Sequence, residues 1–539
     1  MRPSTLSRRS VLRSAVAGLL ATGCGSRSKR PIEGGYVDGG GARGHAFRDG
    51  TLAAGGWRDE RRRVVIVGGG VAGLSTAWRL ARAGVDDIVL LELGSEVGGT
   101  SRGGVVGGLR CPWGAHYLPL PRVEQRALAA FLGDAGIAVG AGDDGRVRVP
   151  DRLLVRDPEE RVAGLGFFEE GLWLRAGASD DDHADVERFE AEVDGLLRLG
   201  RDGRRLFDLP VAHSSTELQD LDRTSAAAWC DARGYTADRI RWYLEYAARD
   251  DFGAALEDTS AWALLHYFAS RPDPATGASA PFLAWPDGNA ELVRALVRSA
   301  PEVEIRSGEI ATRVEAGPNG AVVTSVAPDR RETTRWTADA VIVATPQFVT
   351  RRLLAEDPAR DARAAFRYSP WVVANLHLEK RPMERGFPAA WDSVLHGSES
   401  LGYVDATHQL DRSDARDAVW TWYLPLVDRD ESAARQRLLA TPWEAMRDAV
   451  LDDLRGVHPD IDEVVTRIDV VRYGHAMVKP TPGTLFGGGR ALAQEPIGAV
   501  HFAHSDLSGM ALFEEAHWQG TRAAEEVLAR LSIDHEPLA

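Results

Sequence analysis

Cysteines, metal-ligand clusters and long apolar runs are all scarce in this chain of 539 residues. Its cysteines are Cys24, Cys111 and Cys230, which are too few for a disulfide framework and allow one bridge at most. No CxxC pair or Cys/His cluster indicates a metal site. No apolar run approaches the roughly 20 residues that a membrane-spanning helix needs. These absences exclude a disulfide scaffold and a helical membrane protein, and we expect no metal.

Outside the N-terminus, acidic side chains outnumber basic ones. The formal net charge is −15, although the first thirty residues carry only basic charged side chains. The rest of the chain is therefore strongly acidic and would repel nucleic acid and anionic lipid. We expect neither to be a partner of the folded body. An apolar content of 44% and a charged content of 27% are typical of an ordinary globular protein.

The N-terminus has the pattern of a bacterial export signal. Arg8 and Arg9 form a twin-arginine pair, and the short, weakly apolar stretch 14–21 follows it. Cys24, which comes after small residues, also resembles a lipoprotein cleavage site. We therefore predict that residues 1–24 direct export through the twin-arginine translocase. The destination is the periplasm, or a membrane to which only a lipidated Cys24 attaches the protein. A basic disordered tail is the alternative.

A glycine-rich motif follows the first strongly apolar strand pattern. The run Val64–Val67 ends at Gly68; Gly70 and Gly73 then complete G-x-G-x-x-G, and Glu92 ends the next apolar run about 20 residues on. Gly68 permits the tight turn, Gly70 lets a pyrophosphate approach the backbone, and Gly73 lets helix and strand pack closely. The free N–H groups at the helix start would face the phosphates, and Glu92 could accept the hydroxyls of an adenosine ribose. The motif predicts a dinucleotide site.

The remaining patterns predict two lobes whose segments alternate along the chain. Helical periodicity dominates from about 120 to 300, and strand patterns follow. We predict an α/β fold in which a Rossmann-like domain has a parallel sheet built from discontinuous segments, beside an α+β substrate-binding lobe. The predicted segments are a flexible linker at 25–60, the dinucleotide-binding domain at 61–120, 301–350 and 491–535, a mainly helical substrate lobe with cofactor contacts at its end at 121–300, and a further substrate-lobe segment at 351–490.

Three further motifs resemble the flavin amine oxidase superfamily, which includes amine oxidases, protoporphyrinogen oxidase and phytoene desaturase. Residues 94–102 resemble its second glycine motif, with Arg102 in the role of the arginine that offsets phosphate charge. Residues 113–117 resemble the segment beneath the isoalloxazine ring. Residues 502–524 resemble its FAG-x-E/D, SG, EGA and SG-x-x-AA motifs, in which Asp506 would bind the ribityl chain. The resemblance implies that the dinucleotide is FAD.

The motifs together imply which residues contact FAD. An NAD-dependent dehydrogenase, the other reading of the first glycine motif, would have no use for the second glycine motif or the C-terminal acid. The implied contacts are Gly68, Gly70, Val71, Ala72, Gly73 and Glu92 from the first motif, Gly98, Gly99, Thr100 and Arg102 from the second, Gly114, Ala115 and His116 beneath the ring, Ile310 in the strand-rich block, and Asp506, Met510 and Ala511 near the C-terminus.

Departures from the family pattern concern the substrate. The stretch 369–376 has no lysine, where amine oxidases of the superfamily usually place one near flavin N5. Met510 stands where a tyrosine usually flanks the substrate, and no cysteine matches the position that tethers flavin in some members. The resemblance implies hydride transfer from a C–H bond to flavin N5, with oxygen or another acceptor reoxidising the flavin, and leaves the donor open.

Candidate catalytic residues come from the ring-side motif and the second lobe. His116 lies in the flavin-proximal motif, and His408 could act as a general base. Trp371 and Tyr403 join them, and the other expected wall residues are Asn375, Trp391, Asp392, Trp422 and Tyr423. Core packing is the alternative for each aromatic side chain, and a hydrogen-bonded structural role is the alternative for His408.

The sequence thus predicts an exported FAD-dependent oxidoreductase of the flavin amine oxidase type that acts on a small molecule. Oxidation of an apolar substrate, as by a desaturase or protoporphyrinogen oxidase, is one alternative. A flavin-binding module without turnover is the other, and the missing lysine and tyrosine motivate it.

Overall fold

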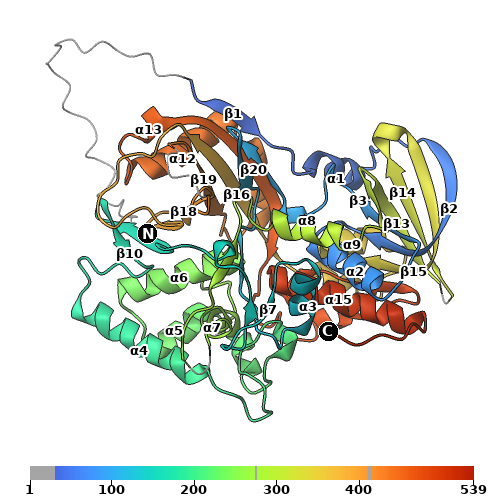
Figure 1. Ribbon diagram of the computed structural model, residues 1–539, viewed down its shortest axis with the longest axis horizontal. Coiled ribbons are helices and arrows are strands. Elements are labelled where there is room, and N and C mark those ends of the chain that lie inside the picture. The colour runs from blue at the N-terminus through green and yellow to red at the C-terminus, as the bar shows by residue number, and fades with distance from the viewer. Residues whose placement is uncertain (1–30, 274–275, 318, 411–415) are drawn as a thin grey trace, which may run out of the picture. The chain divides into compact units, whose positions relative to one another are not determined.

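The computed structural model describes residues 31–273, 276–317, 319–410 and 416–539 (Figure 1). The predicted export signal, with Arg8, Arg9 and Cys24, lies outside the described residues. Residues 32–539 form one unit, in which two large sheets carry helices on their faces. Within the described residues no helix combines the length and apolarity required to cross a membrane.

The first sheet has seven strands and contains the glycine motif. Its order is β12-β3-β2-β15-β14-β13, and β21 pairs with β15. β2 is parallel to β3 and to β15, and β21 joins from the C-terminal region, so the parallel part is built from segments far apart in the chain. This confirms the predicted α/β fold. The strands are β2 (Gly56–Val67), β3 (Ile88–Glu92), β12 (Glu304–Ser307), β13 (Ile310–Ala316), β14 (Ala321–Ala327), β15 (Glu332–Val343) and β21 (Val500–Phe502).

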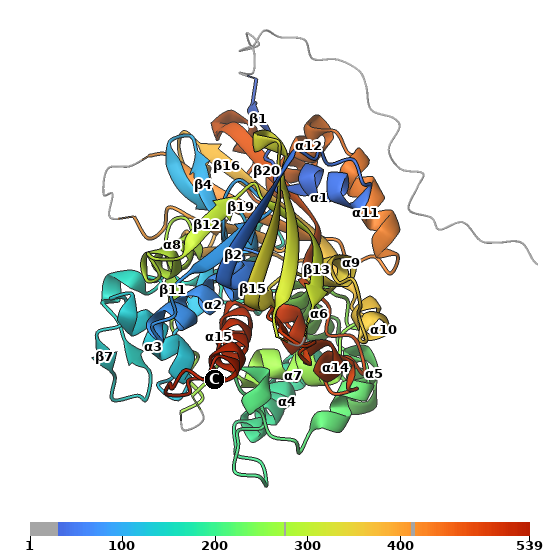
Figure 2. The same ribbon diagram turned by 90° about the vertical axis from the view of Figure 1, so that its right-hand side faces the viewer.

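Helices cover both faces of this sheet because its central strands are apolar on both sides. In β2, Val64 and Ile66 face one core while Val65 and Val67 face another, as the two-residue period of a strand requires. The first core holds α2 (Val71–Arg82), α3 (Arg126–Asp134), α8 (Ala290–Arg298) and α15 (Phe513–Arg530). The second holds α9 (Gln347–Leu353) and α14 (Gly489–Gln494), and Figure 2 shows α15 alongside the sheet.

The second sheet has eight strands in the order β1-β20-β16-β19-β18-β17-β9-β10. One face packs against α11 (Glu431–Ala440), α12 (Trp443–Arg455) and α13 (Ile461–Val464). The other face is rich in aromatic residues and turns toward α6 (Asp238–Phe252). The strands are β1 (Glu33–Tyr36), β9 (Glu160–Gly164), β10 (Phe167–Glu170), β16 (Tyr368–Leu378), β17 (Asp392–Leu395), β18 (Gly402–Asp405), β19 (Ala418–Pro425) and β20 (Val465–Val478).

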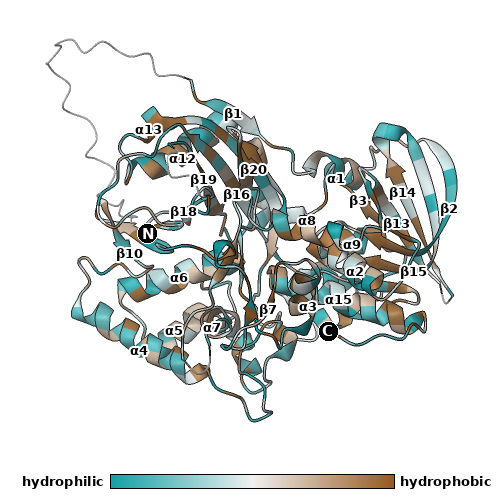
Figure 3. Ribbon diagram, in the orientation of Figure 1, coloured by the Kyte–Doolittle hydropathy of each residue, from teal (hydrophilic) through white to brown (hydrophobic). Residues whose placement is uncertain are grey.

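A helical group packs around its own apolar core on this aromatic side. It consists of α4 (Asp180–Leu196), α5 (Ala226–Arg233), α6 (Asp238–Phe252) and α7 (Ala261–Ala269). A capping box between Ser179 and Asp182 fixes the start of α4. Figure 3 shows α4 mostly in hydrophilic colours, which fits its position on the outside of the group.

Several short strands and one short helix complete the described fold. They are β4 (Gly103–Val106), β5 (Leu109–Pro112), β6 (Tyr117–Pro119), β7 (Gly140–Ala141), β8 (Val147–Arg148), β11 (Phe282–Ala284) and α10 (Arg360–Ala364). The segment predicted as a helical lobe, 121–300, is divided in the structure. Its α3 and α8 join the core of the first sheet, and its β9 and β10 join the second sheet.

The predicted flexible linker at 25–60 is wrong from residue 32 onward. The chain there forms β1, then α1 (Gly41–Arg48), and β2 already begins at Gly56. β1 has the sequence EGGY, which has no apolar periodicity, and it is held by parallel pairing with β20 more than four hundred residues away. Local composition does not reveal such a long-range partner. Residues 25–30 lie outside the described residues.

Candidate functional site

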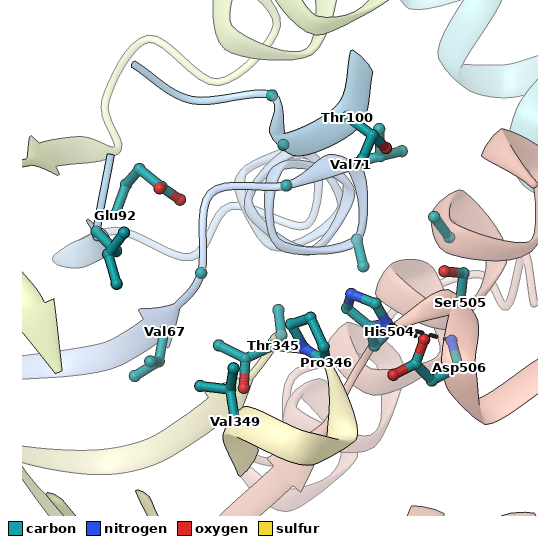
Figure 4. Close-up of a pocket in the computed structure, with 18 of the residues that line it drawn as sticks. Val67, Val71, Glu92, Thr100, Thr345, Pro346, Val349, His504, Ser505 and Asp506 are labelled. Carbon is teal, nitrogen blue, oxygen red and sulfur yellow. Dashed lines mark hydrogen bonds and ion pairs between the residues drawn. The ribbon is translucent and has the colours of Figure 1, made fainter. Parts of the chain in front are cut away.

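A cavity of about 310 Å³ lies where the carboxyl ends of the parallel strands meet the C-terminal segment (Figure 4). Its wall combines the ends of β2 and β3, the start of α2, residues 98–101, the start of β13, and the loop before α15. Glu92 and Asp506 lie at opposite sides of the cavity, with Thr345 and Pro346 between them in the view. Ligands of open α/β sheets bind at this edge of the strands.

The first glycine motif forms a close backbone cradle. Gly68 has φ of +107°, and a Cβ there would lie 2.5 Å from the Ala344 carbonyl oxygen. A Cβ on Gly73 would lie 1.9 Å from the Gly68 carbonyl oxygen, so this glycine permits the packing of α2 on the turn. Gly70, by contrast, has open space around the Cβ position and lines the cavity. α2 begins directly after Gly70 without a side-chain cap, so its first N–H groups are available to an anion.

Glu92 closes one end of the cavity. Its carboxylate accepts hydrogen bonds from the backbone N–H groups of Gly69, at 2.7 Å, and Gly94, at 2.6 Å. Burial raises the pKa of Glu92, and these two bonds and the charge of Arg102 act against that rise. The side chain is therefore fixed in position at the point where the sequence motif places a ribose acceptor.

Asp506 closes the other end and is the centre of a polar cluster. Its carboxylate accepts hydrogen bonds from the Tyr368 hydroxyl at 2.5 Å and the Gln347 N–H at 2.9 Å, and the His504 ring lies 3.0 Å away. Burial alone would raise the pKa of Asp506, but the His504 ring and the donated hydrogen bonds hold it below its ordinary value. The side chain is therefore an anionic acceptor. His475 lines the same cavity, stacked on Phe348 with ring centroids 4.1 Å apart.

These features fit FAD. The long cavity has an acceptor carboxylate at each end and a glycine cradle with a helix N-terminus between them. The starts of both α2 and α15 lie on its wall, where their dipoles favour the negative charge of a pyrophosphate and of a reduced flavin.

A second cavity, of about 160 Å³, continues from the first. The two share one stretch of wall, which consists of Thr100, Ala115, Ala476, Ala511, Leu512 and Phe513. The second cavity lies between the aromatic face of the second sheet and α6, so a molecule bound there would contact whatever group occupies the shared end of the first. It is the candidate substrate site.

Aromatic side chains form about a third of the second cavity's lining residues. The His116 ring lies 5.2 Å from the Tyr423 ring, and burial lowers the pKa of His116 to about 3, so this imidazole is neutral at physiological pH. The hydroxyls of Tyr423 and Tyr473 donate hydrogen bonds to the carbonyl oxygens of Gly114 and Trp113, both at 2.8 Å. These bonds fix the motif predicted to lie beneath the flavin ring.

The same cavity holds more acid than base. Asp250, Asp251, Asp392 and Glu514 line it, together with one cation, Arg271. Arg271 binds both carboxylate oxygens of Asp251, at 3.1 and 3.2 Å. Among the described residues, the other three acids form no ion pair, and the Oε1 atom of Glu514 has no hydrogen-bond partner.

Burial raises the pKa of each of these three acids. For Asp250, burial and the nearby charge of Asp251 raise the pKa to about 7. Burial also raises the pKa of Asp392, with Asp250 adding to the effect, and that of Glu514. A cation placed among them would reverse these shifts.

Most residues expected to contact FAD lie on the cavity walls. Of those predicted, Gly68, Gly70, Val71, Ala72, Glu92, Gly98, Gly99, Thr100, Ala115, Ile310, Asp506 and Ala511 line the first cavity, and Gly114 and His116 line the second. Three do not line either cavity. Gly73 is a packing glycine, the Arg102 side chain binds the Gly99 carbonyl oxygen, and Met510 is buried in the core of the helical group.

The position expected for Met510 is taken by Leu512, which lines both cavities. The chain turns through a short 3-10 helix at residues 505–508 and an αL glycine, Gly509, so Met510 points into the helical group. Matching the motif to the family pattern residue by residue does not show this turn, so it placed Met510 at the cavity.

The predicted catalytic residues separate into two sets. His116, Trp371 and Tyr403 line the second cavity, whereas His408 does not: its Nε2 contacts the Arg156 carbonyl oxygen at 2.8 Å in an exposed loop. The Tyr403 hydroxyl is used in a buried network with Arg161 and His458, so its role there is structural.

Of the other residues expected on the cavity wall, some line the second cavity and others do not. Asp392 and Tyr423 line the second cavity. Asn375 is bonded to the Pro112 carbonyl oxygen and to Thr421, and Trp422 donates to Asp453 on the far face of the sheet. Trp391 packs behind His116, at 5.3 Å between ring centroids.

Sequence reasoning missed several wall residues. They are Phe47, Tyr368 and His475 in the first cavity and Tyr246, Asp250, Arg271 and Glu514 in the second. Acidic pairs on helices are usually solvated, so nothing in the sequence separates Asp250 from the exposed acids of α4. Tyr246 and Asp250 lie four residues apart and so share one face of a helix, but this spacing alone does not identify a cavity wall.

Comparison with known proteins agrees with this geometry. The family model for flavin containing amine oxidoreductase matches residues 71–528. Coproporphyrinogen III oxidase of Mycobacterium tuberculosis is 29% identical over 351 residues, which cover 63% of this chain and 71% of that protein. Carotenoid 3,4-desaturase of Haloarcula japonica is 29% identical over 177 residues, covering 32% of this chain and 31% of that protein.

Solved structures share the fold at low sequence identity. Putrescine oxidase bound to putrescine has a TM-score of 0.65 at 16% identity and covers 88% of this chain and 100% of its own. Cyclohexylamine oxidase from Brevibacterium oxydans has a TM-score of 0.62 at 15% identity and covers 87% of this chain and 99% of its own. The chain therefore belongs to the flavin-containing amine oxidoreductase family and is an FAD-dependent oxidoreductase.

Proposed function

We propose that the protein oxidises a small amine, which binds as a cation in the second cavity. The observation that carries this proposal is the surplus of buried carboxylates there. Asp250, Asp392 and Glu514 form no ion pair among the described residues, although they line a small cavity that adjoins the cofactor cavity. The charge of Arg271 acts on Asp250 and Glu514, but Arg271 is itself paired with Asp251.

Physical reasons favour a cationic ligand. Buried carboxylates without an ion-pair partner are costly, and a bound ammonium group would offset their charge and donate hydrogen bonds to them. Trp371, Tyr423 and Tyr246 line the same cavity, and their rings would add favourable cation–π contacts with a bound ammonium group. An anionic substrate would meet repulsion in the same place.

The chain's own residues bind the amine and take its proton. FAD, when bound, would accept a hydride, which is one proton with two electrons, from the C–H bond beside the amine nitrogen and would pass the two electrons to oxygen or another acceptor. An ammonium ion has no nitrogen lone pair, so it must lose a proton before this bond breaks. A carboxylate with a raised pKa, such as Asp250 or Asp392, is suited to accept that proton. The aromatic walls hold the carbon at the shared end and exclude water.

Anaerobic mixing tests the proposal. The oxidised flavin of the purified holoenzyme should bleach with one or more members of a panel of small amines, and not with their carboxylic acid analogues. Asp392→Asn should raise the amine concentration required for half-maximal bleaching about tenfold to hundredfold, since a hydrogen bond to a charged group contributes about 1.5–3 kcal/mol. Asp238→Asn, on the exposed start of α6, is the control. Bleaching by no amine, or an unchanged Asp392→Asn variant, contradicts the proposal.

A second candidate is the dehydrogenation of an apolar polyene or tetrapyrrole substrate. It is supported by the 29% identity to coproporphyrinogen III oxidase and carotenoid 3,4-desaturase and by the lack of a lysine in β16. A polycarboxylate tetrapyrrole would have to enter a small acidic cavity, which makes this the weaker candidate. The same bleaching experiment, with such compounds added to the panel, discriminates between the two.

We further propose that the protein acts outside the cytoplasm. The twin-arginine pair Arg8-Arg9 and the short apolar stretch after it support export through the twin-arginine translocase, and Cys24 supports attachment to a membrane by lipidation.

A further inference from the structure

An N-terminal segment that the family model does not match reaches the cofactor cavity. β1 adds in parallel to β20 at the edge of the second sheet, and the chain then passes to the first sheet and forms α1 (Figure 1). Near the end of α1, the Phe47 side chain lines the first cavity. We call residues 32–49 the N-terminal strap.

The strap is fixed at both ends. β1 pairs with β20 over Glu33–Tyr36, and Gly34 approaches that strand so closely that a Cβ would lie 1.8 Å from a carbonyl oxygen of β20. In α1, the Arg43 side chain donates a hydrogen bond to the Leu93 carbonyl oxygen at 3.2 Å and forms an ion pair with Asp329 at 2.6 Å. Helix α1 is therefore anchored to the first sheet, whereas β1, the strand that precedes it, belongs to the second sheet.

These anchors place α1 at the Glu92 end of the cavity. Leu93 follows Glu92 directly and lines the cavity itself. On the other side, a Cβ at Gly308 would lie 3.3 Å from the Arg43 guanidinium, and Gly308 precedes the β13 residues that line the same end. Phe47 lies four residues after Arg43, on the same face of α1. Its ring is thus at the end expected to hold adenosine.

We propose that Phe47 binds the adenine ring of FAD and that the strap closes the adenosine end of the cavity. Adenine has a flat face that stacks well on an aromatic ring. Phe47 is partly buried against the apolar core that includes Val67 and Leu353, so its ring is held before the cofactor arrives. Because the strap is anchored to both sheets, FAD leaves this end only when α1 moves. The strap therefore slows cofactor release.

Ligand fragments test the contact. Phe47→Ala should weaken the binding of FAD and of ADP to the apoprotein about tenfold, the effect of losing one base–aromatic stack, and should leave FMN binding unchanged because FMN has no adenine. Phe47→Tyr should restore the affinity. His45→Ala, an exposed position of the same helix, is the matched control. Equal losses for ADP and FMN, or no loss of FAD affinity, would overturn the proposal.

A second variant keeps the proposal testable if Phe47→Ala folds poorly. Phe47→Leu keeps an apolar side chain for packing and removes the aromatic face, so it should keep the Tm of the apoprotein and still release FAD about tenfold faster on dilution. Hydrogen exchange gives an independent result in the unmodified protein: ADP should protect the amides of α1, and FMN should not. Exchange in α1 that is the same with and without ADP overturns the proposal. No substrate is needed, so the outcome is independent of the amine proposal.

Discussion

Gly70 and Gly73 lie three residues apart in one motif, yet the structure gives them different tasks. Gly70 has an extended conformation that any residue can adopt, and its Cβ position is open toward the cavity. Gly73 is pressed against the Gly68 carbonyl oxygen. Gly70 leaves space for the ligand, and Gly73 allows α2 to pack closely against the turn that precedes it.

Substitution by alanine should separate these tasks. Gly70→Ala should keep the Tm of the apoprotein and weaken FAD binding at least about tenfold, because its methyl group occupies ligand space. Gly73→Ala should lower the free energy of unfolding by about 1–3 kcal/mol, the cost of overpacking a tight contact. Thermal melts of both apoproteins and FAD titrations check this. The same Tm loss in both variants would show that the two glycines have one role.

The acids of the second cavity predict a pH dependence. The pKa of Asp250 is raised to about 7, so as the pH falls through 7 this carboxyl becomes neutral and the cavity loses attraction for a cation. The KM of an amine substrate should therefore rise as the pH falls below about 7. Asp250→Asn should have the high KM at every pH, because its side chain never carries the charge. Steady-state rates from pH 5 to 9 give the comparison. A KM that rises equally in the variant would assign the effect to another group.

At the scale of elements, the contact between α2 and α15 positions both helix starts at the cofactor. α15 crosses α2 at Gly520, where a Cβ would lie 2.2 Å from the Ala72 carbonyl oxygen. The Thr76 hydroxyl donates a hydrogen bond to the Gly520 carbonyl oxygen at 3.0 Å, and the Ser75 hydroxyl and the His517 ring are 2.8 Å apart. The two helices can approach this closely only because residue 520 has no side chain.

Gly520→Ala should therefore force the helices apart. We expect the free energy of unfolding to fall by about 1–3 kcal/mol and FAD to bind more weakly, since the first turns of both helices line the cavity. Gly133→Ala, in the exposed last turn of α3 with nothing within 4 Å, is the control and should not destabilise the protein, because alanine is the better helix former. Denaturant melts and FAD titrations measure both effects. A neutral Gly520→Ala variant would contradict the tight crossing.

The elements that the sequence predicted well are those whose signal is local. Val64–Val67, the glycines and Glu92 specify strand, turn, helix and strand within thirty residues, and the structure has them as β2, α2 and β3. β1 could not be predicted, because four residues without periodicity become a strand only through pairing with β20. The acidic cavity could not be predicted either, since Asp250, Asp392 and Glu514 come from a helix, a strand and another helix that meet only in three dimensions.

At the scale of the whole molecule, residues from near both ends of the described chain line the cofactor cavity. Its wall includes Phe47 near the start and Ala516 near the end of the described chain, with contributions from both sheets. FAD can therefore bind fully only after nearly the entire chain has folded. A protein that is threaded unfolded through a membrane would have to acquire FAD afterwards, whereas a twin-arginine signal would carry the loaded protein across.

The proposed export route depends on Arg8, Arg9 and Cys24, and substitutions at these positions test it. Replacing the pair by Arg8→Lys and Arg9→Lys should leave the FAD-loaded protein in the cytoplasm, because the translocase reads the two arginines. Cys24→Ser should still be exported but should appear in the soluble fraction, since the proposed site of lipidation is removed. Cell fractionation, followed by immunoblotting and flavin absorbance of each fraction, measures location and cofactor content together. If the lysine variant reaches the periplasm as efficiently as the unmodified protein, the twin-arginine route is wrong; if Cys24→Ser stays with the membrane, lipidation of Cys24 is not what holds it there.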